Sequence, residues 1–139
     1  MLRSLTFRAL LLLAPLAAGC GSDDVSDNPT APTPIAVTEQ FNGTLTPNGG
    51  RTHEFTVQQA GTVNVRLSAL TPDDTIVIGL SLGTWNGQVC QVILPNDKAT
   101  LNTTVTGTAQ NTGLFCARIY DAAGTLTAST DYTIDVTHF

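Results

Sequence analysis

The sequence predicts an all-β protein, a single antiparallel β-sandwich of jelly-roll or immunoglobulin-like type with about eight strands. Thr, Val, Gly and Asn are frequent and only 12% of the residues are charged, a composition that suits half-buried strands and disfavours helices. About eight runs of alternating apolar residues follow one another, separated by turn residues. No stretch long enough for an amphipathic helix carries a helical apolar stripe.

Three segments of different composition divide the chain. Residues 1–19 have the order of a secretory signal, with two arginines before a short apolar run. That run is about half of the roughly 20 residues that a bilayer span needs, so we expect cleavage rather than a transmembrane helix. Residues 20–38 are rich in Asp and Pro and are predicted to form a disordered linker. Residues 39–139 are predicted to form one β-sandwich domain.

The first four predicted strands come from the most regular alternation. In the clearest of them, Val63, Val65 and Leu67 lie on one face, and polar residues lie on the other. Turns rich in Gly, Pro, Asn or Asp separate these runs. The four predicted strands are Gln40–Leu45, Thr52–Val57, Thr62–Leu70 and Thr75–Leu82.

The second half of the domain is interrupted more often. Gly83–Gly87 is predicted to be a turn, Pro95-Asn96-Asp97 is expected to close the strand that follows it, and Gly107–Gly113 is predicted to be a loop. The remaining predicted strands are Gln88–Leu94, Ala99–Thr106, Gly113–Tyr120 and Asp131–His138.

The end of the signal, Leu16-Ala17-Ala18-Gly19-Cys20, resembles the lipobox of bacterial lipoproteins. The resemblance implies that Cys20 becomes the first residue of the mature protein and carries fatty acyl chains such as palmitate, which anchor it to a membrane of the cell envelope. Gly21 rather than Asp follows the cysteine, and in diderm lipoproteins this fits sorting to the outer membrane. The alternative is an ordinary secretory signal that leaves Cys20 as a free thiol.

The mature chain is acidic. Cleavage after residue 19 removes two of the six basic residues and none of the 11 acidic ones, so the formal net charge changes from −5 to −7. Nucleic acids and anionic lipid headgroups are therefore poor candidate partners.

Cys90 and Cys116 are the only cysteines that follow Cys20. An exported chain reaches an oxidising compartment, where paired cysteines normally form a bridge. We therefore predict a structural Cys90–Cys116 disulfide.

Several strand motifs resemble the bacterial pre-peptidase C-terminal domain. Such domains are β-sandwich modules of secreted proteases and other surface proteins, so the resemblance implies an accessory, binding or targeting role rather than catalysis. The motifs are Phe41-x-Gly43-Thr44-Leu45, His53-x-Phe55-x-Val57, Gly61-x-Val63-x-Val65-x-Leu67, Phe115-Cys116-x-Arg118-Ile119-Tyr120-Asp121 and Tyr132-Thr133-Ile134-x-Val136.

Few residues point to metal binding or catalysis. Asp73, Asp74 and Asp121 lie at predicted loop ends and are weak candidates for calcium, because aspartate in a turn usually bonds its own backbone. His53 and His138 are expected on strand faces, and no serine lies in a nucleophile-elbow context. We therefore expect no cofactor and no enzymatic activity.

Trp85 is the leading candidate for binding, with Asn86 beside it and Tyr120 on the outward face of its strand. Exposed Trp and Tyr side chains offer large contact areas at low entropic cost. The alternative is that Trp85 covers one end of the sandwich. We predict a non-enzymatic binding or structural lipoprotein whose partner is a surface protein or a polysaccharide. The alternatives are an accessory domain, with a targeting or chaperone-like role, for a secreted hydrolase; a carbohydrate-binding module; and a small hydrolase.

Overall fold

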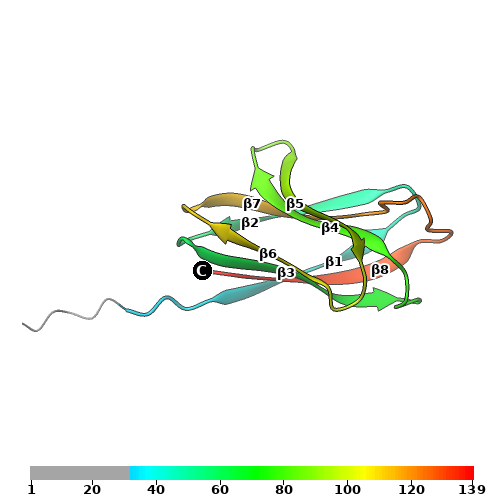
Figure 1. The fold of residues 1–139 in the computed structure, drawn as a ribbon, viewed down its shortest axis with the longest axis horizontal. Helices are drawn as coiled ribbons and strands as arrows, with labels where there is room; N and C mark the ends of the chain where they lie inside the picture. The colour runs from blue at the N-terminus through cyan, green and yellow to red at the C-terminus, as the bar shows by residue number, and fades with distance from the viewer. Residues whose placement is uncertain (1–31) are drawn as a thin grey trace, which may run out of the picture. The chain divides into compact units, whose positions relative to one another are not determined.

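The computed structural model describes residues 32–139, which form two four-stranded antiparallel sheets packed face to face (Figure 1). The strand order is β1-β8-β3-β6 in one sheet, sheet A, and β2-β7-β4-β5 in the other, sheet B. The prediction of an all-β sandwich with about eight strands is confirmed. The strands are β1 Val37–Leu45, β2 Gly50–Val57, β3 Gly61–Thr71, β4 Ile78–Trp85, β5 Cys90–Ala99, β6 Thr104–Ala109, β7 Gly113–Tyr120 and β8 Thr130–His138.

The signal segment, the lipobox and Cys20 lie outside the described residues. Within residues 32–139, no helix is long and apolar enough to cross a membrane.

One apolar core fills the space between the two sheets. Successive side chains of a strand point to opposite faces, so the alternation that predicted the strands also determines which residues lie inside. On the sheet A side the core contains Val65, Leu67 and Ile134, and on the sheet B side it contains Leu80 and Ile119, all fully buried.

Several strands have different bounds from those predicted. The strand expected from Thr75 begins at Ile78 and continues to Trp85, through the start of the predicted turn. β5 continues through Pro95 to Ala99, so the following strand, β6, begins only at Thr104. Proline is tolerated there because β5 is an edge strand, whose outer backbone groups have no partner in the sheet. β6 also includes Gly107, which was predicted to lie in a loop.

A cluster of rings closes the edge of the sandwich where β1 and β2 meet. The rings of Phe41 and His53 are stacked with their centroids 5.0 Å apart, and the Tyr132 hydroxyl is hydrogen-bonded to His53 Nε2 at 2.8 Å. The Tyr132 ring passes directly below Gly43, where an added Cβ would lie 2.6 Å from the phenolic oxygen. Glycine at this position therefore allows the tyrosine to reach the histidine.

The second histidine has a similar environment on β8. His138 is buried, its ring stacks on Phe55 with centroids 5.3 Å apart, and its Nε2 lies 2.8 Å from Glu39 Oε1. Both histidines lie on strand faces, as expected, and the structure places them on the inner faces.

The predicted disulfide between Cys90 and Cys116 is present. It joins the first residue of β5 to the middle of β7, and β4 lies between these two strands in sheet B. The bridge therefore connects strands that share no backbone hydrogen bonds.

We expect reduction of the disulfide to lower the melting temperature clearly. The bridge closes a sequence separation of 26 residues, and removing such a constraint from the unfolded chain costs about 3 to 4 kcal/mol of stability. Thermal unfolding with and without dithiothreitol measures the effect. The double variant Cys90→Ala/Cys116→Ala is the control and should not respond to the reductant. An unchanged melting temperature of the reduced wild-type protein would contradict a structural role.

The environment of His53 predicts a loss of stability in mild acid. Burial and, second, the positive charge of Arg51 lower the pKa of His53 below its usual value of 6.5. The unfolded chain then binds a proton more readily than the folded one, so the free energy of unfolding decreases as the pH falls below about 6.5. Urea unfolding between about pH 5 and pH 7 should show a weaker pH dependence in His53→Gln than in the wild type. Identical slopes would exclude this linkage.

Candidate functional site

The end of the β4–β5 hairpin turns out of the plane of sheet B (Figure 1). The register between the two strands shifts between Leu82 and Gly83, which is the position of a β-bulge. Beyond it, the Gln91 carbonyl crosses the outer face of β4 so closely that any Cβ at Gly83 would collide with it. Glycine therefore permits the hairpin to fold back over the sheet.

The disulfide fastens this raised hairpin to the sheet below it. Because β5 and β7 are separated by β4, their residues would normally lie about two strand spacings apart, or close to 10 Å. The Cα atoms of Cys90 and Cys116 are only 5.8 Å apart. Cys90 pairs with Trp85 directly before the turn, so the end of the hairpin next to its tip is held against the outer face of β7.

The tip of the hairpin is fixed by its own side chain. The Asn86 Oδ1 atom accepts hydrogen bonds from the backbone N–H groups of Gln88 at 3.0 Å and Val89 at 2.9 Å. The Asn86 N–H also donates to the Val89 carbonyl at 3.3 Å. This turn leaves the Val89 side chain 56% exposed.

An open groove of about 440 Å³ lies between the raised hairpin and the flat part of sheet B. The sequence left open whether Trp85 is exposed or covers an end of the sandwich. In the structure this side chain is half-buried and forms part of the wall of the groove. The hairpin contributes Trp85, Gln88, Val89 and Cys90 to the lining, and the sheet contributes Gly50, Thr52 and Arg118.

Arg118 supplies a positive charge to the floor of this groove. Its guanidinium carbon lies 5.1 Å from the centroid of the Tyr120 ring, a cation–π contact. The one ion pair within residues 32–139 joins His138 and Glu39 and does not involve Arg118. Sequence analysis did not single out Arg118, although its outward position between Cys116 and Tyr120 on a predicted strand was a usable signal.

Tyr120 lies beyond Arg118 and is engaged with β5. Its ring covers Gly79, and its hydroxyl donates a hydrogen bond to Asp97. Burial of the phenol and, next, this hydrogen bond raise the pKa of Tyr120 to about 12. Tyr120 therefore stays neutral, and its hydroxyl remains hydrogen-bonded to the Asp97 carboxylate.

The three predicted binding residues thus have different places. Trp85 lines the groove, Asn86 shapes the tip of the hairpin, and the Tyr120 ring makes a cation–π contact with Arg118.

The candidate calcium ligands Asp73 and Asp121 accept hydrogen bonds from turn residues. Asp73 Oδ1 accepts hydrogen bonds from the backbone and the hydroxyl group of Thr75, and these bonds lower the pKa of Asp73. The Asp121 carboxylate accepts from the backbone N–H groups of Asn48, Thr125 and Leu126. In the described part of the chain, no three or more His, Cys, Asp or Glu residues are arranged to hold a metal ion. This includes Asp74, the third candidate ligand.

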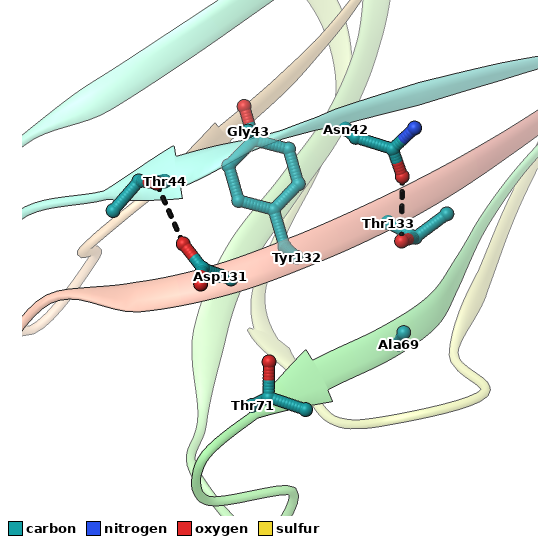
Figure 2. Close-up of a pocket in the computed structure, with 8 residues that line it drawn as sticks. All are labelled: Asn42, Gly43, Thr44, Ala69, Thr71, Asp131, Tyr132 and Thr133. Carbon is teal, nitrogen blue, oxygen red and sulfur yellow. Dashed lines mark hydrogen bonds between the residues drawn. The ribbon is translucent and has the colours of Figure 1, made fainter.

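A second hollow, of about 390 Å³, lies over sheet A (Figure 2). Four of its polar side chains are paired with one another: the Thr44 hydroxyl donates to Asp131 at 2.6 Å, and the Thr133 hydroxyl donates to Asn42 at 2.8 Å (Figure 2). It has neither an exposed aromatic wall nor an unpaired cation, so the hairpin groove is the stronger candidate site.

No protein-family model and no curated protein sequence matches the chain. In structure, the chain is similar to a mitogen derived from Yersinia pseudotuberculosis, with a TM-score of 0.56, 16% identity, and coverage of 76% of this chain and 88% of that one. It is also similar to a periplasmic inhibitor of g-type lysozyme from Aeromonas hydrophila, with a TM-score of 0.55, 14% identity, and coverage of 73% and 86%. At these identities the likeness shows a shared β-sandwich fold.

Proposed function

We propose that this chain is a lipid-anchored lipoprotein of the cell envelope, that its β-sandwich is a non-enzymatic binding module, and that the groove below the β4–β5 hairpin is its binding surface. The observation that carries the proposal is the rigid hairpin. The Cys90–Cys116 bridge holds the pair of residues that closes the turn, the Asn86 side chain holds the turn itself, and the close crossing at Gly83 holds the bend. A loop fixed in these three ways loses little conformational entropy when it binds a partner.

The chemistry around the hairpin also favours binding. The groove combines a half-buried tryptophan, an exposed Val89 and the cation of Arg118, and sites of this mixed type often carry most of the energy of an interface. On the other side of the hairpin, Ile93 is 60% exposed and Leu114 is 48% exposed, and both line a shallow hollow. Clustered apolar surface is typical of an interaction site.

The non-enzymatic role is supported by the environment of the histidines and by the structural neighbours. His53 and His138 stack on Phe41 and Phe55 inside the sandwich, where they support its edge. The two neighbours are described as a mitogen and an inhibitor, and neither description is that of an enzyme.

Location in the envelope is supported by the sequence and by the disulfide. A bridge such as Cys90–Cys116 is typical of oxidising compartments, and one structural neighbour is a periplasmic protein. The lipobox at Cys20 favours a lipid anchor, and Gly21 favours the outer membrane.

An accessory role beside a secreted hydrolase is the second candidate function. The strand motifs that resemble the pre-peptidase C-terminal domain favour it. In that case the hairpin would contact the hydrolase itself, so the same experiment identifies this partner.

Photo-crosslinking on intact cells tests the proposed surface. A benzophenone amino acid at Val89, on the hairpin tip, inserts into C–H bonds of proteins and sugars alike. The matched control carries the probe at Thr104, which is exposed on the edge strand β6 of sheet A. We expect a discrete crosslinked product from the Val89 probe and none from the Thr104 probe. Equal products from both positions, or no product from Val89, would contradict the assignment of the hairpin as the binding surface.

A further inference from the structure

We propose that the hairpin groove recognises a sugar unit bearing one carboxylate, as part of a polysaccharide outside the cell. The inference rests on the proposed function and names the ligand class of the same site. It depends on how Arg118, Trp85 and the polar residues of the groove are placed relative to one another.

Arg118 differs from the other arginines of the described chain. Arg66 donates to Asn102 Oδ1 at 2.6 Å, and Arg51 Nε donates to the Thr44 carbonyl at 3.5 Å. Within residues 32–139 the structure records no hydrogen-bond acceptor and no ion-pair partner for the guanidinium of Arg118. Its guanidinium carbon lies over the Tyr120 ring at 5.1 Å from the centroid, a contact that uses none of its N–H donors. Two parallel N–H groups of a guanidinium match the oxygens of a carboxylate.

No acidic residue of the described chain forms an ion pair with Arg118. Asp97 already accepts the hydroxyl hydrogen of Tyr120. Glu54 lies on β2, where it pairs with Cys116, and it forms no ion pair with Arg118. Ser81 on β4 is the backbone partner of Arg118 on β7. Its hydroxyl is buried and makes no hydrogen bond with any described residue. Among the described residues, the cation of Arg118 therefore has no ion-pair partner beneath the hairpin.

The opposite wall suits the body of a sugar. A pyranose ring has an apolar C–H face and polar edges, so it binds best where an aromatic plane lies beside hydrogen-bonding groups. Trp85 offers the aromatic surface, and Thr52 and Gln88 offer a hydroxyl and an amide on the two sides of the groove. Its volume of about 440 Å³ lies in the range of sites for small ligands, and its open form leaves room for a continuing polymer.

The charge of the whole protein limits the ligand further. The formal net charge after signal cleavage is −7, because four basic residues face 11 acidic ones. A polymer with a charge on every unit would be repelled at long range, whereas an isolated carboxylate meets Arg118 at short range. We therefore infer a glycan with sparse acidic sugars.

Calorimetric titration with matched oligosaccharides tests the inference. The probes are sialyllactose with lactose, and glucuronosyl-xylotriose with xylotriose, so that each pair differs by the acidic sugar. The protein is the full mature chain with Cys20→Ser, which cannot be lipidated. We expect an acidic member to bind about tenfold or more tightly than its neutral partner, as for a charge-assisted hydrogen bond.

Variants separate the groove from general charge effects. Arg118→Gln should remove the preference for the acidic member, Arg118→Lys should retain part of it, and Trp85→Ala should weaken the binding of both members. Arg66→Gln, the matched control on the opposite sheet, should change nothing. Melting temperatures confirm that each variant is folded.

Two results would overturn the inference. One is the absence of any preference for the acidic members in the wild type, and the other is an equal loss with Arg66→Gln and Arg118→Gln. If the sugars fail while the Val89 probe captures a protein, the inference is wrong and the proposed function stands. If the sugars and the Val89 probe both fail, both proposals are wrong.

Discussion

The structure depends on the burial of alternate side chains between two four-stranded sheets. This constraint also requires the sandwich edges to close, because open strand edges pair with other chains. The edge strands β1 and β2 of the two sheets contact each other, as do β5 and β6. At the first of these edges the rings of Phe41, His53 and Tyr132 fill the gap. His53 stacks on Phe41 at this edge, and His138 stacks on Phe55, so both histidines of the chain pack inside the sandwich.

With the inner faces committed to the core, the two outer faces are free to differ. On sheet A, short polar side chains of β1 and β8 pair across the strands, as in Thr38 with Thr137 and Gln40 with Asp135, so the face offers few unsatisfied groups. On sheet B, the outward positions of β4 are small, and this lets Tyr120 cover Gly79 and lets the hairpin fold over Gly83. The second face thus gains a raised hairpin, a groove and a cation, Arg118, that has no ion-pair partner among residues 32–139.

Most of the sandwich could be predicted from the sequence, because period-two alternation reports burial directly. The continuation of β5 past Pro95 could not, since it depends on that strand lying at an edge of the sheet. The Cys90–Cys116 bridge could be predicted because an exported chain reaches an oxidising compartment. Trp85 could be named as a binding candidate because tryptophan is enriched at binding sites. The groove could not be predicted because it depends on the register shift at Gly83. The availability of Arg118 could not be predicted because it depends on the hydrogen bond between Tyr120 and Asp97. These are tertiary facts that no local pattern encodes.

Trp85 is the only tryptophan of the chain, so its fluorescence reports on the groove alone. The most direct test of a functional groove is to mix the mature chain carrying Cys20→Ser with cell-envelope fractions of the host and to record Trp85 emission and its quenching by acrylamide. If the groove is the binding surface, emission shifts and quenching falls as the protein binds. Co-sedimentation of the protein with the envelope while Trp85 emission and quenching stay unchanged would place the binding surface elsewhere and contradict the account.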